Sequence, residues 1–592
     1  MNIQALGLVT ETRKPRSASA AWSDALAATA AIDSNPSQLL PHIIEHLALS
    51  HGDTPALLSD IETFSFGELG GRMNRYANWA LSQGLKPGDC VALMLTNRPD
   101  YVAIWLGLSK LGIVTALINT ALAGSSLRHC LKLAAPRHII AESQFASACA
   151  AYCEGQANAR FWDYSGMPDN TAMKLQVAAS GAQQVTIDDT ALLIYTSGTT
   201  GLPKAARVSH RRLLVWSLWF KGLLGNTPED RMYDCLPLYH SVGGVVAVMA
   251  TLVAGGSTVI AEKFSARRFW GDVCRWDCTQ IQYIGELCRY LLNSPAGREE
   301  GHSRLRLACG NGLRGDIWKS FQDRFAIPQI VEFYAATEGN FSLFNVEGKP
   351  GSIGRIPPYL RHRFPTAIVK FDASTGQCVR SADGFCIAVE AGEAGEALGR
   401  IGQGSGSARF EGYTDAAESE RKVLRNVFAE GDAWFRTGDL MRFDTGGFFY
   451  FVDRIGETFR WKGENVSTLE VADVLSGVPG VNGAVVYGVD VRGMDGKAGM
   501  ALLLTGEGFD RREFRRHAEA QLPHYAIPVF LRLATEVAVT ETFKHKRNEL
   551  MGDGFFPTPG GDRLFVWLGE AAGYECLDAT LHGKIVTGAV RL

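Results

Sequence analysis

The chain has no pair of cysteines at the spacing of a zinc site, although its 592 residues include twelve cysteines. The nearest pairs are Cys149/Cys153 and Cys274/Cys278, and neither forms a CxxC motif or part of a Cys/His cluster. Cysteines scattered in this way are typical of small core residues in a reducing compartment. We therefore expect no zinc site and no secreted protein.

An excess of basic residues is also lacking. Lys and Arg number 59 against 62 Asp and Glu, which gives a formal net charge of -3. Nonspecific binding to a nucleic acid needs cations that neutralise its phosphates, so the balance argues against that class of function. Hydrophobic residues at 46% and charged residues at 20% are typical of a globular protein. A soluble enzyme with local basic sites is the expectation.

No segment has the pattern of a secretion signal or a convincing membrane span. Near the N-terminus, Asp24 interrupts the apolar stretch that a signal peptide would need. The uncharged run at 242–261 has about the length that a bilayer requires. Four glycines interrupt it, namely Gly243, Gly244, Gly255 and Gly256. We therefore predict a core helix, a turn and a strand there, and a cytoplasmic protein that is soluble or peripherally attached to a membrane.

Helices and strands alternate through the first two-thirds of the chain. A helical stretch begins at Phe66, stops at Gly84 and precedes an apolar strand at 91–95. Further strands are expected at 191–195, 305–309 and 330–334, each followed by a loop rich in Gly or Thr. This alternation indicates a layered α/β fold, in which ligands bind at loops beyond the carboxyl ends of the strands.

The length of the chain predicts more than one core. An alternating strand begins near Gly446, and the later part of the chain carries shorter elements of both kinds. We expect a large α/β domain over 1–453, which would bind the ligands, and a smaller mobile α+β domain over 454–592.

One loop carries the strongest chemical pattern, Tyr195-Thr-Ser-Gly-Thr-Thr-Gly-Leu-Pro-Lys204. Glycines let the backbone approach an anion, successive N–H groups form a concave donor surface, and Lys204 adds a positive charge. The loop is not a Walker A motif, because Ala205 follows the lysine where Ser or Thr is required. We predict that phosphates bind to Tyr195, Thr196, Ser197, Gly198, Thr199, Thr200, Gly201 and Lys204.

With this loop the sequence resembles the adenylate-forming superfamily of acyl-CoA synthetases, luciferases and peptide-synthetase adenylation domains. The resemblance implies that His240, in Leu236-Pro-Leu-Tyr-His240, lies near the acyl carboxylate. It implies adenine contacts from Gly310, Asn311, Gly312, Tyr334 and Ala335. It also implies a phosphate contact from Thr337 and a Mg²⁺ ligand in Glu338, a carboxylate that suits a hard cation.

Further motifs of the superfamily follow in the second part of the chain. By resemblance, Asp439 accepts from both ribose hydroxyls, Arg454 contacts the ribose, and Gly456 stands at the hinge where relatives carry Asp or Lys. Lys462, Gly463 and Glu464 match the loop that serves thioester formation with CoA. Lys544 matches the catalytic lysine, although Phe543 replaces the usual preceding Gly and Lys546 lies two positions on.

Two stretches narrow the resemblance to one branch, Tyr334-Ala-Ala-Thr-Glu-Gly-Asn340 and Phe459-Arg-Trp-Lys-Gly-Glu-Asn-Val-Ser467. They are similar to the fatty-acid-transport-protein and very-long-chain acyl-CoA synthetase branch, and the similarity extends from about Asp53 to about Leu577. It implies an ATP-dependent ligase that makes a fatty acyl-adenylate and then the CoA thioester, with ATP, Mg²⁺ and CoA. A homodimer is one assembly that the sequence allows.

Three alternatives stay open at this point. One is a CoA ligase for bile-type or sterol-derived acids, and a second is a fatty acyl-AMP ligase that hands its product to a carrier protein. The third is a fatty-acid uptake component at the membrane whose ATP site is vestigial. Against the third, Thr337, Glu338, Asp439 and Lys544 are all present.

Overall fold

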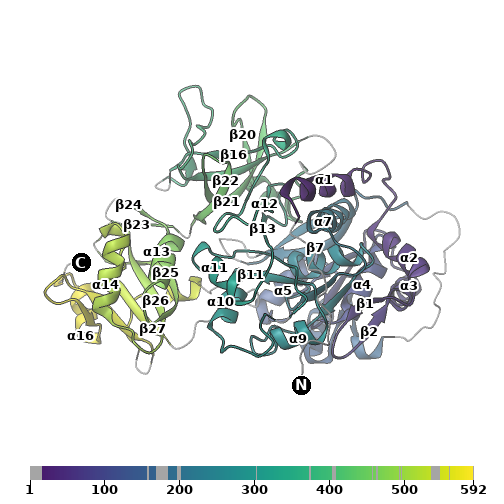
Figure 1. Cartoon of the computed structure of the whole chain (residues 1–592), viewed down its shortest axis with the longest axis horizontal. Coiled ribbons are helices and arrows are strands. Elements are labelled where there is room, and N and C mark those ends of the chain that lie inside the picture. Colours follow the sequence, from purple (N-terminus) through teal and green to yellow (C-terminus); the bar gives the residue numbers. More distant parts are fainter. Residues whose placement is uncertain are drawn as a thin grey trace, which may run out of the picture. The chain divides into compact units, whose positions relative to one another are not determined.

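The structure of the chain is a computed structural model that describes residues 16–156, 159–167, 184–196, 202–301, 303–372, 375–402, 409–456, 458–461, 464–492, 494, 496–534, 547–558, 561–590 and 592, with backbone alone at 460, 464, 465 and 547–549. It divides into two units (Figure 1). Unit 1 comprises Met1–Pro350 and Gly402–Lys422, and unit 2 comprises Gly351–Ile401 and Val423–Leu592. The expected domain boundary at Arg454 falls inside unit 2 and stays a prediction.

Unit 1 contains a six-stranded sheet in the order β6-β5-β3-β4-β7-β8. Its strands are β3 (Cys90–Met94), β4 (Val114–Leu117), β5 (His138–Ala141), β6 (Arg160–Asp163), β7 (Thr190–Thr196) and β8 (Lys204–Ser209). All neighbours pair in parallel except β7 and β8, which are antiparallel. The strands predicted at 91–95 and 191–195 are therefore confirmed.

A second run of strands in unit 1 has the order β14-β13-β12-β11-β9-β10-β1-β2. These strands are β1 (Pro55–Leu58), β2 (Thr63–Ser65), β9 (Arg231–Asp234), β10 (Ser257–Ile260), β11 (Gln280–Ile284), β12 (Leu307–Asn311), β13 (Ile330–Ala335) and β14 (Ser342–Asn345). The strand predicted at 330–334 is confirmed, and the one predicted at 305–309 begins two residues later, at Leu307. The glycine-rich and threonine-rich segments follow the carboxyl ends of these strands.

The helix predicted to begin at Phe66 is present in unit 1. In α3 (Phe66–Ser82), the Ser65 side chain accepts from the N–H of Glu68, whose carboxylate accepts from the N–H of Ser65 in return. The chain leaves this helix through Gly84, which has φ +69°. The other helices are α1 (Ala18–Thr29), α2 (Leu40–Ser50), α4 (Pro99–Ser109), α5 (Gly124–Ala134), α6 (Ala146–Glu154), α7 (His210–Leu224), α9 (Phe269–Arg275), α10 (Gly285–Asn293), α11 (Gly315–Arg324) and α12 (Ala416–Arg421).

The uncharged run at 242–261 forms a π-helix, η3 (Val242–Ala247), the helix α8 (Val248–Leu252), a turn and β10. Gly244 is required there, because a Cβ at that position would lie 1.9 Å from the Leu238 carbonyl oxygen. The predicted core helix, turn and strand are confirmed. Within the described parts of the chain, no helix combines the length and the apolar character that crossing a bilayer requires.

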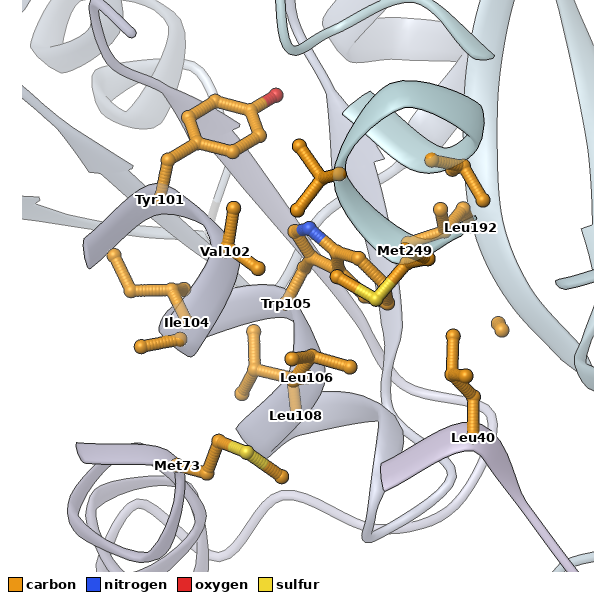
Figure 2. Close-up of a cluster of buried hydrophobic side chains, with 14 of the residues drawn as sticks. Leu40, Met73, Tyr101, Val102, Ile104, Trp105, Leu106, Leu108, Leu192 and Met249 are labelled. Carbon is orange, nitrogen blue, oxygen red and sulfur yellow. The ribbon is translucent and has the colours of Figure 1, made fainter. Parts of the chain in front are cut away.

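The main hydrophobic core of unit 1 surrounds α4, a helix that is buried on every face. Figure 2 shows Trp105 of this helix beside Met249 of α8, with Leu192 of β7 and Leu40 of α2 nearby. All four side chains are fully buried. The core therefore packs the six-stranded sheet against α8, which immediately follows η3, and so fixes the position of the chain after His240.

Unit 2 begins with the strands β15 (Gly354–Arg355), β16 (Thr366–Val369), β19 (Gly395–Arg400), β20 (Val423–Arg425), β21 (Ala433–Phe443) and β22 (Phe448–Arg454), which pair antiparallel. The strand predicted near Gly446 is thus β22. Two short ladders, β17 (Phe371–Asp372) with β18 (Gln377–Cys378) and β23 (Phe459–Trp461) with β24 (Glu464–Val466), complete this region.

The last part of unit 2 has its own core around a five-stranded sheet, β25-β26-β27-β28-β29. Its elements are α13 (Thr468–Ser476), β25 (Val481–Asp490), β26 (Lys497–Thr505), α14 (Arg511–Gln521), β27 (Phe530–Ala534), α15 (Arg547–Asp553), β28 (Arg563–Trp567), β29 (Tyr574–Cys576) and α16 (Ala579–Val586). The predicted fold class, a large layered α/β part followed by a smaller α+β part, is confirmed.

Candidate active site

Lys204 opens β8 directly opposite the end of β7. The register pairs Thr196 with Lys204 and Tyr195 with Ala205, so both ends of the predicted phosphate loop lie side by side. The Lys204 ammonium forms an ion pair with the Glu418 carboxylate and lies 5.7 Å from the centre of the Tyr413 ring. The predicted loop residues Ser197, Gly198, Thr199, Thr200 and Gly201 lie outside the described residues. Tyr195 is buried, and its hydroxyl donates to the Cys130 carbonyl at 2.8 Å.

A segment from much later in the chain runs beside β8. The Arg207 N–H donates to the Gly412 carbonyl at 3.0 Å, and the Thr414 N–H donates to the Ala205 carbonyl at 2.9 Å. These backbone hydrogen bonds place Tyr413, which is 5% exposed, between Lys204 and the segment after β13. There the Tyr413 hydroxyl donates to Glu338 Oε1 at 2.7 Å. Burial, followed by the charge of Glu338, raises the pKa of Tyr413 far above its ordinary value, so the hydroxyl stays a donor.

The Thr337-Glu338 segment is held from a third direction by Arg212 of α7. One guanidinium nitrogen of Arg212 donates to the Thr337 carbonyl at 2.5 Å and another to the Arg409 carbonyl at 3.1 Å. Arg212 is 8% exposed and also pairs with Glu411, whose carboxylate accepts from the Ser209 hydroxyl and N–H. Buried, charge-assisted contacts of this kind fix the backbone at Thr337.

His240 lies where the chain enters the π-helix η3. Its ring is half-buried, 4.6 Å from the Tyr239 ring between centroids. The next residue, Ser241, has its hydroxyl 3.2 Å from Thr337 Oγ1. The structure therefore brings His240 and Thr337, which are far apart in the sequence, to one place in unit 1. A π-helix at this point is consistent with a functional segment.

The turn predicted to contact adenine follows β12. Gly312 has φ +83°, which favours glycine, and a Cβ on Gly310 would lie 2.2 Å from the Tyr283 carbonyl oxygen. Glu332 of β13 accepts from the N–H groups of Gly312 and Leu313, and from the Tyr283 hydroxyl at 2.5 Å. Burial raises the pKa of Glu332 to about 8 in spite of these donors. Glu332 thus fixes the shape of the turn.

Two adjacent positions remain accessible to a planar ligand. Tyr334 is half-buried and packs edge-on against Phe341 at 5.7 Å, and Ala335 is exposed. Asn311 Oδ1 is buried, and no hydrogen-bond partner for it occurs in the part of the chain that the structure describes. An unpartnered carbonyl oxygen of this kind can accept from a bound base. The turn and Tyr334 therefore fit an adenine ring.

In unit 2, Asp439 and Arg454 lie opposite each other on β21 and β22. Arg454 Nε is 3.2 Å from Asp439 Oδ1, and Asp439 is 4% exposed. Asp453 is fully buried and accepts from the Thr468 N–H at 2.7 Å and from the Thr468 hydroxyl, so it joins the end of β22 to the start of α13. Gly456, the predicted hinge residue, follows with φ +94°, a conformation that favours glycine.

Three of the predicted positions in unit 2 lie outside the described residues: Lys462, Gly463 and Lys544. Glu464 is described by its backbone, which pairs with Trp461 in the β23–β24 ladder. Their roles stay predictions.

Sequence reasoning missed Tyr413, Glu418, Arg212, Glu411, Ser241 and Glu332. The segment Gly412-Tyr413-Thr414-Asp415 has no composition that distinguishes it from an ordinary turn. Its position beside Lys204 results from pairing between distant segments. Only the tertiary structure supplies that information.

The described residues contain no group of three or more His, Cys, Asp and Glu side chains that could hold a metal ion by themselves. Mg²⁺ usually takes one or two carboxylates and completes its shell with phosphate oxygens and water. Glu338, a single buried carboxylate near Lys204, fits that mode of binding.

Comparison with known proteins agrees with this arrangement. Residues 44–393 match the family model described as AMP-binding enzyme, and residues 470–544 match the one described as AMP-binding enzyme C-terminal domain. The chain belongs to the AMP-binding enzyme family. Within this family, the AMP-binding enzyme described here is 40% identical over 539 residues to long-chain fatty acid transport protein 1 of Mus musculus, which covers 89% of this chain and 83% of that protein.

A second relative gives the same result. Long-chain fatty acid transport protein 2 of Rattus norvegicus is 36% identical over 580 residues, which covers 94% of this AMP-binding enzyme and 92% of that protein. These identities confirm the predicted branch, and with it an adenylate-forming ligase.

Solved structures show the same fold. ATP-bound MatB from Rhodopseudomonas palustris has a TM-score of 0.73 at 23% identity, covering 87% of this chain and 99% of that chain. A benzoate CoA ligase from Burkholderia xenovorans LB400 has a TM-score of 0.73 at 19% identity, covering 87% and 100%.

Proposed function

We propose that this AMP-binding enzyme converts long- or very-long-chain fatty acids to acyl-CoA thioesters. A fatty acid carboxylate attacks the α-phosphate of ATP, and pyrophosphate leaves as the acyl-adenylate forms. The CoA thiolate then attacks the carbonyl carbon of this mixed anhydride and releases AMP. The observation that carries the proposal is the cluster in unit 1 of Lys204, Thr337 and Glu338, which Tyr413 and Arg212 hold together. His240 stands next to this cluster in the chain through Ser241, whose hydroxyl lies beside the Thr337 hydroxyl.

The first step brings two anions together, so its main obstacle is charge. Lys204 supplies a positive charge beside the phosphate loop, and the Thr337 hydroxyl supplies a donor. Glu338 would hold Mg²⁺, which neutralises the phosphate oxygens when bound. The Tyr413 hydroxyl orients the Glu338 carboxylate through Oε1. Donors fixed in advance in this way contribute about 3 kcal/mol each to such reactions.

The Lys204 ammonium is paired with the Glu418 carboxylate, whose side chain is 19% exposed. A phosphate that approaches Lys204 would compete with this carboxylate. The pairing keeps the lysine side chain beside the Tyr413 ring, and so near the place where the phosphates are expected.

The second step depends on residues of unit 2. Gly463 would let the thiol pass close to the backbone, and Gly456 would permit the rotation that exchanges Lys544 for the Lys462-Gly463-Glu464 loop. No covalent protein nucleophile is needed, because the anhydride is already activated. Burial also raises the pKa of several cysteine thiols, to about 12 for Cys130 and about 11 for Cys149.

The choice of substrate rests on the relatives, whose names refer to long-chain fatty acids. Structures with the same fold include a MenE from Bacillus subtilis in complex with ATP and a magnesium ion, at a TM-score of 0.67. This complex supports ATP with Mg²⁺ as the nucleotide substrate, and the name of that protein, an O-succinylbenzoate Coenzyme A synthetase, supports CoA as the acceptor. Peripheral membrane association is part of the same proposal, since fatty acids partition into bilayers.

The names of the relatives also favour a second candidate, a component of fatty-acid transport. The two functions differ in one respect. A binding component needs no turnover of ATP, whereas the proposed ligase releases AMP and pyrophosphate in proportion to the thioester formed.

The experiment is an assay of the purified chain with ATP, Mg²⁺, CoA and acids from short to very long, including a sterol-derived acid. We expect acyl-CoA and AMP in equal amounts, with long acids preferred. A Glu338→Gln variant serves as the matched control. Acyl-adenylate without thioester would indicate an acyl-AMP ligase, preference for the sterol acid would change the substrate class, and no AMP with any acid would overturn the proposal.

A further inference from the structure

One end of the unit 2 sheet collects exposed basic and aromatic side chains. The strands β16, β19 and β21 are neighbours in this sheet, and β20 pairs with the start of β21. The register pairs Thr366 with Gly399, Arg400 with Trp434, and Ala433 with Arg425. The start of β16, the end of β19, the start of β21 and the end of β20 therefore lie at the same end. The Arg400 N–H also donates to the Pro365 carbonyl at 2.9 Å, which ties the turn at 358–364 to this end. We call this end together with that turn the basic sheet end, and its exposed side chains are Tyr359, Arg361, His362, Arg363, Arg400, Arg425 and Phe428.

The turn before β16 presents part of this set in a fixed conformation. The Leu360 side chain is 4% exposed and anchors the turn by its burial, while the Tyr359 side chain is 59% exposed. The Leu360 N–H donates to the Pro357 carbonyl at 2.8 Å, and the Arg363 N–H donates to the Leu360 carbonyl at 2.9 Å. Tyr359 and its basic neighbours therefore stand on a short 3₁₀ turn whose backbone is held by its own hydrogen bonds.

The second aromatic residue comes from the connection between β20 and β21. Phe428 is 40% exposed and packs edge-on against Trp434 at 5.3 Å between ring centroids. Trp434 therefore holds the Phe428 ring in place while part of the ring stays exposed to a partner.

The charge of the basic sheet end contrasts with that of the whole chain, which is -3. The segment 357–366, which leads into the start of β16, contains two arginines and one histidine but no Asp or Glu. The two acids in the β20–β21 connection are Glu430 and Asp432. The Asp432 carboxylate accepts from the N–H groups of Val427 and Phe428 and from Trp434 Nε1, so its charge serves the turn itself.

We propose that the basic sheet end docks the protein on the surface of a bilayer that contains anionic phospholipids. Arginine side chains pair with lipid phosphates, and a tyrosine and a phenylalanine beside them insert at the level of the headgroups. The inference rests on the peripheral membrane association proposed above, but not on the ligase reaction. Its test needs neither ATP nor CoA, so the two proposals can fail separately.

The test is flotation of the purified full chain with vesicles of phosphatidylcholine, with and without phosphatidylserine. The first variant is Arg361→Gln/Arg363→Gln, and its matched control is Arg512→Gln/Arg516→Gln on the exposed face of α14, which removes the same charge from the same unit. We expect binding to the anionic vesicles to fall about fivefold for each arginine of the first variant, and so roughly 25-fold for the pair. The control should bind like the wild type.

A second variant, Tyr359→Ser/Phe428→Ser, removes the aromatic rings and keeps the charge. It should weaken binding to both kinds of vesicle, and added salt should weaken the wild type on anionic vesicles alone. Equal loss in the α14 control would overturn the proposal, because net charge and not this surface would then decide binding. No flotation of the wild type, or binding of the wild type to polyglutamate without flotation, would also overturn it.

Discussion

The two units place their predicted site residues by different means. In unit 1, Thr337 and Glu338 are held by Arg212 and Tyr413, side chains from distant parts of the sequence. In unit 2, Asp439 and Arg454 face each other because β21 and β22 are consecutive antiparallel strands. Short-range pairing suffices for the second site, whereas the first exists only when the whole unit is folded.

The difference has a physical consequence. A buried carboxylate with a specific donor loses orientation when that donor is removed, and several neighbours then shift together. A pair set by strand register keeps its backbone positions when one side chain changes. Substitutions in unit 1 should therefore impair ligand binding and catalysis together. Substitutions in unit 2 should impair one half-reaction and not the other.

The largest expected effect comes from unit 2, and it tests that separation directly. Lys544→Ala should slow adenylate formation by roughly a thousandfold or more, because the charge between the attacking carboxylate and the α-phosphate is no longer compensated. Thioester formation from synthetic acyl-adenylate and CoA should fall far less. The measurement is each half-reaction by itself.

Lys546→Ala is the matched control for this prediction and should pass both assays. If Lys546→Ala fails adenylation and Lys544→Ala does not, the assignment belongs to the other lysine. If neither variant is impaired, the segment is not catalytic, and unit 2 would then not separate the two half-reactions.

Glu338→Gln should give the next largest effect and tests unit 1. The amide keeps the size of the side chain but loses the charge, so we expect a loss of about a hundredfold in pyrophosphate exchange at low Mg²⁺. Tyr413→Phe, which leaves the charge and removes the donor to Oε1, should cost about tenfold and raise the Mg²⁺ requirement.

Both measurements come from a Mg²⁺ titration of the exchange rate. Wild-type exchange by Glu338→Gln at low Mg²⁺ would remove this residue from the metal site. An unchanged Tyr413→Phe alongside an impaired Glu338→Gln would show that the cross-links in unit 1 are not needed for orientation.

Gly456→Ala should have a smaller effect that is confined to one half-reaction. The residue has φ +94° and a Cβ there would meet no atom within 4 Å, so the cost is backbone strain of about 1 kcal/mol. We expect the thioester step to slow about fivefold and adenylation to change little. Gly384→Ala carries similar strain, at φ +83° and with equally open space, away from the predicted hinge, and should leave both steps unchanged.

Glu332 of unit 1 should affect the stability of the protein and its dependence on pH. Burial raises its pKa from 4.5 to about 8, so the folded state binds the proton more tightly than the unfolded state. The contribution to stability is present below the unfolded pKa and is lost as pH rises towards 8. At about 1.4 kcal/mol per pKa unit, the free energy of unfolding should fall by up to about 5 kcal/mol between these limits. Denaturant unfolding should show this loss in the wild type and not in Glu332→Gln; an identical pH dependence in both would contradict it.

Several elements could be predicted from the sequence because their causes are local. The capping Ser65 and Glu68 define the start of α3, and the glycines in 242–261 turn a run of membrane length into η3, α8 and β10. The strand that ends at Thr196 and the loop after it are equally local, since apolar alternation and glycine content act within a few residues. The family could be identified from motifs of this kind, each of which is continuous in the chain.

The sequence by itself determined the fold class, the family and the order of the motifs. Only the tertiary structure decided which side chains surround those motifs: Tyr413 between Lys204 and Glu338, Arg212 on the Thr337 carbonyl, and Glu332 beneath the Gly312 turn. Each of these contacts joins segments that are far apart in the chain, and no periodicity or composition of the sequence links the two segments. Strand pairing and the need to pair buried charges decide which segments meet. Both causes act only when the chain folds.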